Sequence, residues 1–169
     1  MKVETFRILG WHDEESGLVI EENDSWILVK HIPVDFIIDG YKVYKKEFII
    51  ERTRGDNEIF IERVLRLKNV EENKPEDFKF SDTAGLLKWT ENKYGIFEFQ
   101  DSDQSDLFYG KINKIENGIL KIDSIQLDGE VEHEYDYEFD LNEIRAITFE
   151  TDYFNSIKLL WDDVNKNEK

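Results

Sequence analysis

The sequence predicts a mainly β protein made of two related small β-barrel modules in tandem, with one short helix at the start of the second module. Three observations predict this: short apolar-patterned runs separated by turn dipeptides, an approximate internal repeat, and one helical pattern near the middle of the chain. Residues 1–76 are expected to form the first module and residues 77–169 the second. The boundary falls in the polar, charged stretch 70–77, which contains one of the two prolines.

The internal repeat is found when the sequence is shifted against itself by 93 residues. Apolar residues and glycines then coincide over most of both halves, although chance alignment of apolar positions is an alternative to a true duplication. The aligned pairs include Phe6 with Phe99, Gly17 with Gly110, Val19 with Ile112, Ile27 with Leu120, Val29 with Ile122 and Ile32 with Ile125.

Each half contains five short runs with the pattern of strands. The turns between them include Asn117-Gly118 and Asp128-Gly129, which favour hairpins because these residues tolerate a positive φ. The expected strands are 4–9, 18–22, 25–32, 41–51 and 59–67 in the first half, and 110–115, 119–125, 130–139, 144–150 and 154–160 in the second.

One segment has the signals of a helix, expected at about 82–93. Ser81 suits the N-cap, Leu86 and Leu87 supply an apolar side with Trp89, and Gly95 is placed to end the helix. Tryptophans interleaved with aliphatic residues are usually buried, so Trp89 and Trp26 are expected in the core.

The order of a helix followed by five strands resembles the Sm-like fold, a small β-barrel with an N-terminal helix, over most of residues 81–161. Without the helix, the first half is similar to SH3-like barrels. The tandem also resembles bacterial proteins of uncharacterised role that carry two such modules. The resemblance is one of topology, without the RNA-binding loops of the Sm family, and it implies a fold and no activity.

The chain is strongly acidic, with a net charge of −17. Residues 1–80 carry 13 Lys/Arg against 18 Asp/Glu, and residues 81–169 carry 9 against 21. Such a field repels nucleic acids and anionic membranes and attracts basic proteins. An alternative is that the charge mainly keeps the protein soluble.

The most acidic segment, 130–139, alternates carboxylates with apolar and aromatic residues. In a single strand, the carboxylates would occupy one face and the rings the other. That face is either a docking strip for a basic partner or a solvated edge that prevents strand pairing. The corresponding first-half segment is rich in lysine, an asymmetry that favours docking of the modules or a homodimer. The strip consists of Glu130, Glu132, Glu134, Asp136 and Glu138.

Motifs for catalysis and cofactors are absent from the sequence. There is no cysteine, no nucleophile elbow and no phosphate-binding loop, and His12, His31 and His133 lack the spacing of metal ligands. No enzyme activity and no cofactor are therefore expected. The absence of cysteine and of a long apolar run leads us to expect a cytoplasmic protein. The calcium-loop pattern is weakly matched by Asp101, Asp103 and Asp106.

Three functional hypotheses follow. The first is a non-catalytic interaction protein, such as an acidic inhibitor or immunity-type protein, that captures a basic partner. The second is an Sm-like or SH3-like nucleic-acid binder, and the third is a carboxylate-based hydrolase in a cleft between the modules. The basic face that the second would use consists of Lys42, Lys45, Lys46, Arg52, Arg54, Arg63 and Arg66.

Overall fold

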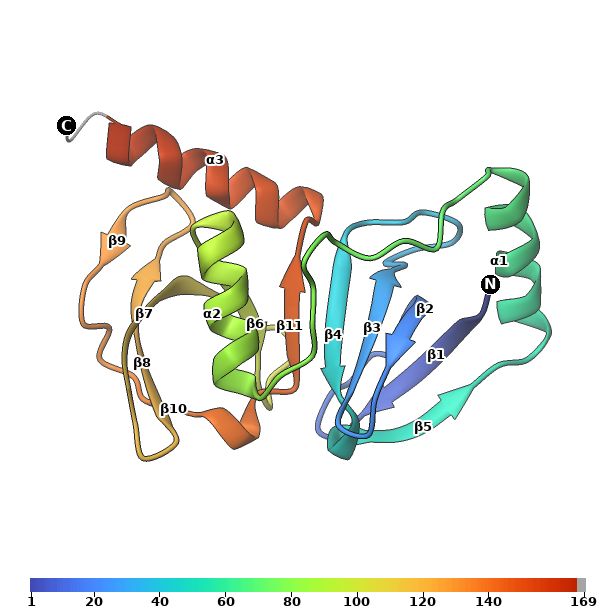
Figure 1. Cartoon of the computed structure of the whole chain (residues 1–169), viewed down its shortest axis with the longest axis horizontal. Coiled ribbons are helices and arrows are strands. Elements are labelled where there is room, and N and C mark those ends of the chain that lie inside the picture. Colours follow the sequence, from blue (N-terminus) through green and yellow to red (C-terminus); the bar gives the residue numbers. More distant parts are fainter. Residues whose placement is uncertain (167–169) are drawn as a thin grey trace.

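The computed structural model describes residues 1–166 and shows a mainly β chain, as the sequence predicts (Figure 1). The strands are β1 (Val3–Ile8), β2 (Glu15–Glu22), β3 (Trp26–His31), β4 (Tyr41–Lys45), β5 (Ile49–Thr53), β6 (Phe97–Gln100), β7 (Phe108–Glu116), β8 (Ile119–Ile125), β9 (Val131–Glu132), β10 (Phe139–Asp140) and β11 (Ala146–Phe149). The helices are α1 (Asp56–Leu67), α2 (Thr83–Tyr94) and α3 (Asp152–Lys166), with 3-10 turns η1 (Lys46–Phe48) and η2 (Leu141–Glu143).

All strands belong to one antiparallel sheet with the order β10-β8-β7-β6-β11-β4-β3-β2-β1-β5, and β9 also pairs with β8. The path does not rejoin itself, so the strands form one open sheet and not the two separate small barrels that the sequence predicts. One physical reason is that β4 pairs with β11 of the other half, from Ala146 opposite Tyr44 to Phe149 opposite Tyr41. This pairing joins the two groups of strands seen side by side in Figure 1.

The two halves pair their strands in corresponding order. The first half reads β5-β1-β2-β3-β4 and the second β11-β6-β7-β8-β10. An irregularity between Val19 and Glu21 in the β2–β3 pair corresponds to one between Ile112 and Lys114 in the β7–β8 pair. An extra residue at such a site bends a strand and increases its twist. Both hairpins are therefore bent at the same distance from their turns.

The predicted Asn-Gly turn and the predicted helix end at Gly95 are confirmed, whereas the predicted N-cap is wrong by one residue. Asn117 and Gly118 both have positive φ values, 54° and 77°, and close the β7–β8 hairpin. Helix α2 ends at Gly95, whose φ of 90° suits glycine, and it begins one residue after the predicted position. The N-cap is Asp82, whose carboxylate accepts a hydrogen bond from the Gly85 N–H, and not Ser81.

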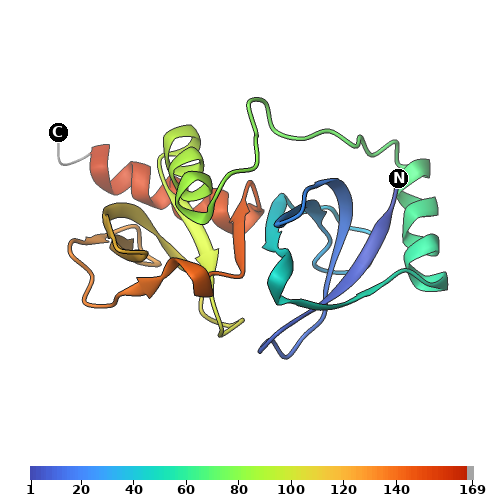
Figure 2. The same cartoon turned by 60° about the horizontal axis from the view of Figure 1, so that its bottom comes forward.

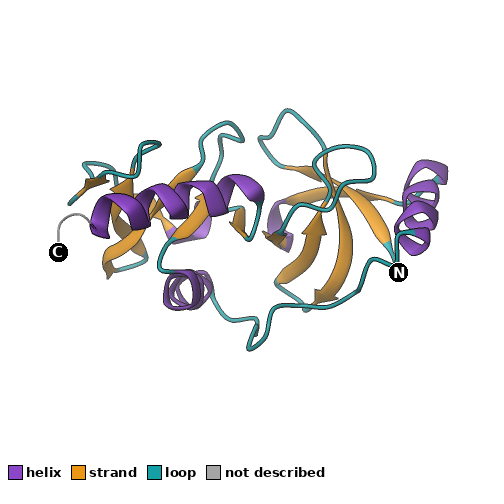
Figure 3. Cartoon of the chain, turned by 90° about the horizontal axis from the view of Figure 1, so that it is seen from above, coloured by secondary structure: helices purple, strands orange, loops and turns teal. Residues whose placement is uncertain are grey.

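Two predicted strands are wrong, because 59–67 and 154–160 lie in helices α1 and α3. The residues that they bury follow a helical spacing: Ile61 and Leu65 are four apart, and Phe154 and Ile157 are three apart. Helix α3 lies across the strands of the second half, and α1 stands at the opposite end of the molecule (Figure 3). The predicted strand 41–51 is also interrupted, because η1 separates β4 from β5.

The sheet is buried on both faces near the junction of the halves. One face contributes Val43 and Phe149 to the largest apolar cluster, and the other contributes Tyr44 and Ala146 to a second cluster. Trp26 is buried in the largest cluster, as predicted. Trp89 is half-buried against the same cluster.

Candidate functional site

The acidic segment 130–139 does not form the single two-faced strand that its alternation predicts. Glu134 has a left-handed backbone with a φ of 53°, and its N–H donates to Asp123 Oδ1 at 3.0 Å. Because a left-handed residue interrupts an extended chain, the alternation of faces is lost. Tyr137, expected on the buried face, is 53% exposed. The five carboxylates of Glu130, Glu132, Glu134, Asp136 and Glu138 are exposed, but they do not form one ladder.

The three aspartates of the weak calcium-loop match lie in loop 101–107, between β6 and β7. Asp103 Oδ1 accepts hydrogen bonds from the N–H and the hydroxyl of Ser105, at 2.9 and 2.6 Å, and these bonds lower the pKa of Asp103. Asp101 and Asp106 do not complete a metal site with Asp103. Within residues 1–166, no group of three or more His, Asp or Glu side chains is arranged to hold a metal ion.

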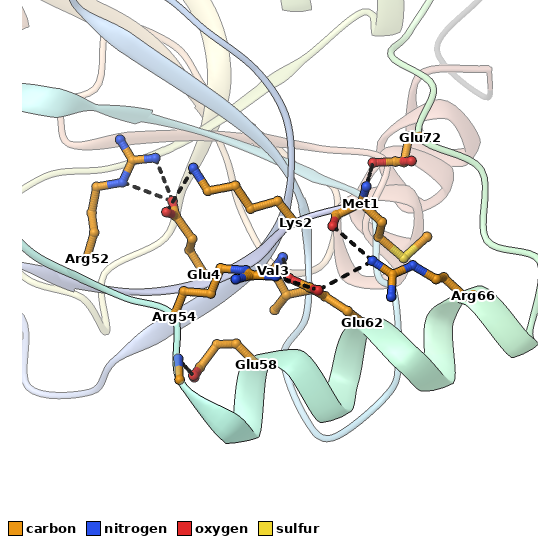
Figure 4. A network of polar contacts seen from close by, with 11 residues as sticks. Met1, Lys2, Val3, Glu4, Arg52, Arg54, Glu58, Glu62, Arg66 and Glu72 are labelled. Atoms are coloured by element: carbon orange, nitrogen blue, oxygen red, sulfur yellow. Dashed lines mark hydrogen bonds and ion pairs between the residues drawn. The ribbon is translucent and has the colours of Figure 1, made fainter.

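The basic face expected for a nucleic-acid binder is largely used inside the fold. Lys42 and Lys45 are buried in β4, and Lys45 donates to the carbonyl of Leu141 at 2.9 Å. Arg52 and Arg54 contact carboxylates of neighbouring elements, and Arg66 contacts a carboxylate of its own helix (Figure 4). Arg63 of α1 is exposed and forms no ion pair within residues 1–166. The ion pairs are Arg52 with Glu4 and Glu22, Arg54 and Arg66 with Glu62, and Lys46 with Glu22. Cations paired in this way are poorly placed to contact phosphates.

A cleft of about 600 Å³ lies between the two halves, beside two corresponding loops. Loop 9–14 follows β1 and loop 101–107 follows β6, and the two loops meet at the lower centre of Figure 2. Trp11 Nε1 donates to the Asp101 carbonyl at 2.8 Å, and the Asp13 N–H donates to Gln104 Oε1 at 2.9 Å. These bonds hold the loops together and fix one wall of the cleft.

The floor of the cleft contains the buried carboxylate of Glu15. Glu15 Oε1 accepts from Lys42 Nζ at 3.1 Å and from Gln104 Nε2 at 3.2 Å, and Glu15 Oε2 accepts from the Tyr44 hydroxyl at 3.2 Å. Lys42 also donates to Gln100 Oε1 at 3.2 Å. Because both carboxylate oxygens are occupied, Glu15 is better suited to organising the cleft than to attacking a substrate.

His31 lies beside this network without joining it. Its Nδ1 is 3.8 Å from Glu15 Oε2, which is too long for a hydrogen bond. Burial, helped by the positive charge of Lys42, lowers the pKa of His31 to about 4. At neutral pH the ring is therefore uncharged and adds no positive charge to the cleft.

A row of buried polar side chains leads from the cleft into the second half. Thr148 of β11 is opposite both Lys42 of β4 and Glu98 of β6, and Glu98 is opposite Tyr109 of β7, so the row lies on one face of the sheet. Burial raises the pKa of Glu98 to about 7. Four buried atoms have no hydrogen-bond partner within the described chain: Glu98 Oε2, Thr148 Oγ1, Tyr109 Oη and, in neighbouring β3, His31 Nδ1.

The rim of the cleft is acidic. Asp13, Glu14 and Asp103 line it with exposed carboxylates, and the one lysine among the described lining residues, Lys42, is paired with Glu15. Carboxylates gathered along a cleft raise the local concentration of cations. The arrangement therefore favours a positively charged group.

Sequence reasoning did not bring the residues of this cleft together: Lys42, Asp103 and His31 were singled out for other sites, and Glu15 and Gln100 were not singled out at all. Lys42 lies between Tyr41 and Val43, and Glu98 and Gln100 alternate with Phe97 and Phe99; a charged or amide residue flanked by large apolar strand residues is the signal that could have identified them. His31 was considered only as a metal ligand. Its position beside Glu15 depends on the pairing of β2 with β3, which histidine spacing does not reveal.

Comparison with known proteins adds no relative: no protein-family model matches the chain, and neither curated proteins nor solved structures give a match. Among the helices of residues 1–166, none has the length and apolar character required to cross a membrane.

Proposed function

We propose that this protein is a non-catalytic interaction module, of the inhibitor or immunity type, that captures a basic partner in the cleft between its two halves. A Lys or Arg side chain of the partner enters the cleft between loops 9–14 and 101–107. The observation that carries the proposal is the rim of three exposed carboxylates, Asp13, Glu14 and Asp103, over a floor whose lysine is already paired. The lack of cysteine suits the cytoplasm as the place where this occurs.

The architecture supports the proposal. We infer that the two halves are copies of one small barrel-type unit, on the basis of their corresponding strand order, the matching irregularities near Val19 and Ile112, and the 93-residue shift. Corresponding loops of two such copies then meet at the cleft. A site built from both copies requires their correct association, so β4–β11 pairing and partner binding are coupled.

A peptide-binding experiment tests the proposal. A fluorescent hexa-arginine peptide is titrated with the intact protein at low and moderate salt, and the anisotropy is measured. The test variant D13N/E14Q/D103N neutralises three carboxylates of the rim and takes the net charge from −17 to −14. We expect binding at least about tenfold weaker than that of the wild type, because the close contacts to the cation are lost.

The control variant E130Q/E134Q/D136N makes the same change of charge in the exposed acidic segment. It should bind the peptide nearly as well as the wild type. Equal losses in both variants would mean that the peptide responds only to net charge, and the cleft would then have no special role. Circular dichroism of each variant establishes that the fold is retained.

A further inference from the structure

Helix α1 turns an apolar stripe toward solvent at one end of the molecule. Its inner side buries Ile61 and Leu65, and Figure 3 shows the strands of the first half on that side. On the outer side, Phe60 is 63% exposed and Leu67 is 76% exposed. Val64 lies between them, and spacings of four and three residues place the three side chains on one face of the helix.

The stripe continues onto the loop between β3 and β4. Lys68, directly after α1, donates from Nζ to the Phe36 carbonyl at 2.9 Å and holds this loop beside the end of the helix. Within the loop, Val34, Phe36 and Ile37 are exposed. An apolar surface of this extent, in a chain with 36% charged residues, is typical of an interaction site. The α1 patch consists of Val34, Phe36, Ile37, Phe60, Val64 and Leu67.

The charges beside the stripe are separated along the helix. Asp56 lies in the first turn of α1 and Arg63 in its second half, and both are exposed. They are seven residues apart, so they lie on the same flank of the stripe. Neither forms an ion pair within residues 1–166. When two copies of α1 lie antiparallel about a twofold axis, the same flanks meet, and Asp56 of one copy lies toward Arg63 of the other.

The charge distribution of the whole chain favours association at this end. Residues 1–80 carry 18 Asp/Glu against 13 Lys/Arg, whereas residues 81–169 carry 21 against 9. Helices α1 and α3 stand at opposite ends of the molecule (Figure 1), so two copies joined through α1 keep their more acidic halves apart. Exposed charges more than about 8 Å apart are largely screened at physiological ionic strength. Self-association through α1 therefore meets little repulsion from the acidic halves.

We propose that the α1 patch binds a second copy of this chain, with the two α1 helices antiparallel about a twofold axis. Phe60, Val64 and Leu67 of each copy pack against those of the other. Asp56 of each copy pairs with Arg63 of the other. Within the described chain, no residue of the α1 patch lines the cleft that captures a basic partner, so either site can be lost without the other.

Sedimentation equilibrium of the intact protein measures the association, from about 5 to about 500 μM at constant ionic strength. We expect the mass to rise from that of one chain toward that of two. The dissociation constant should be on the order of 10–100 μM, because two short helices bury a small interface. A mass that stays at one chain would overturn the proposal. A mass that rises beyond two chains would also overturn it, because a twofold pair is closed.

A serine substitution tests the apolar contact. Phe60→Ser acts twice in a twofold dimer and should weaken association at least about tenfold. Leu159→Ser is the matched control: this leucine of α3 is 69% exposed and lies outside the α1 patch, so the variant should associate as the wild type does. Equal losses in both variants, or no loss in Phe60→Ser, would contradict the assignment of the patch. Phe60→Ser should bind the hexa-arginine peptide as the wild type does, which separates this test from that of the cleft.

Charge reversal tests the antiparallel orientation. Arg63→Asp places a second carboxylate beside Asp56 of the other copy and should weaken association at least about tenfold, because the repulsion occurs twice. The double variant D56R/R63D restores opposite charges and should associate nearly as well as the wild type. Circular dichroism of each variant establishes that the fold is retained. If the folded double variant associates no better than Arg63→Asp, the antiparallel pair is wrong.

Discussion

Helices α1 and α3 occupy corresponding places in the two halves, each following the last strand of its half, yet they are attached by different chemistry. Helix α1 buries two glutamates, Glu58 and Glu62, together with two apolar residues. Helix α3 buries Phe154 and Ile157. The position of a helix in this architecture therefore does not determine which interactions hold it.

The buried carboxylate of Glu62 is fully provided with partners. Glu62, 1% exposed, accepts from the Val3 N–H at 2.9 Å and from two nitrogens of Arg54 at 2.8 and 3.0 Å (Figure 4). The Arg54 hydrogen bonds lower the pKa of Glu62. Phe154 needs no such directed contacts, since its ring packs edge-on to Tyr94 with centroids 5.6 Å apart. A polar attachment fixes geometry, whereas an apolar one needs only a matching surface.

The largest effect is expected from Phe154→Ala, which breaks the apolar attachment. The side chain is completely buried, so its removal leaves a cavity and should lower the free energy of unfolding by about 4 kcal/mol. Urea unfolding measures the change. Leu159→Ala on the same helix, where the side chain is 69% exposed, is the control and should change stability by less than about 0.5 kcal/mol. A loss below about 1 kcal/mol for Phe154→Ala would show that α3 is not held by this ring.

Glu62→Ala breaks the polar attachment of α1. It should lower the free energy of unfolding by about 3 kcal/mol, because Arg54 and the Val3 N–H lose their buried partner. The matched control is Glu51→Ala, which removes a glutamate from an ion pair with Arg7 whose two side chains are 53% and 55% exposed. An exposed pair is expected to contribute less than about 1 kcal/mol. Equal losses for the two glutamates in thermal or urea unfolding would contradict the importance assigned to burial.

The smallest expected effect is a dependence of stability on pH, and it comes from two buried groups near the junction of the halves. The folded-state pKa of Glu98 is about 7 instead of 4.5. Its contribution to the free energy of unfolding is therefore complete below pH 4.5 and is lost as pH rises toward 7. The pKa of His31 is about 4 instead of 6.5, so its contribution is complete above pH 6.5 and is lost as pH falls toward 4. Between pH 4.5 and 6.5 the two slopes, each about 1.4 kcal/mol per pH unit, oppose one another.

Replacing one group should reveal the slope of the other. Unfolding is measured at pH 4.5, 5.5 and 6.5. Relative to the wild type, the stability of Glu98→Gln should rise with pH across this window, and the stability of His31→Gln should fall. Parallel pH profiles for the wild type and both variants would mean that neither group changes its proton affinity on folding.

Prediction from the sequence succeeded where the signal is local. Residues 119–125 form a strand with the predicted bounds, and Asn117-Gly118 closes the predicted hairpin. It failed at 59–67 and 154–160, where dense apolar residues are compatible with either a strand or a helix. It also failed at 130–139, because Glu134 takes a left-handed conformation while its N–H binds Asp123 of another strand. The sequence did not predict that the cleft residues lie next to one another, because Glu15, Lys42 and Gln100 meet only after β2, β4 and β6 are placed in one sheet.

The sequence by itself determined the mainly β character of this protein, its strong negative charge, several of its turns and the end of helix α2 at Gly95. These features depend on side-chain periodicity, composition and the conformational range of single residues, which are properties of short segments. The tertiary structure decided that β4 pairs with β11, that α1 and α3 are helices, and that Glu15, Lys42 and Glu98 are buried. Those outcomes depend on which distant segments share a surface, because burial and hydrogen bonding between strands are settled only when the whole sheet has formed.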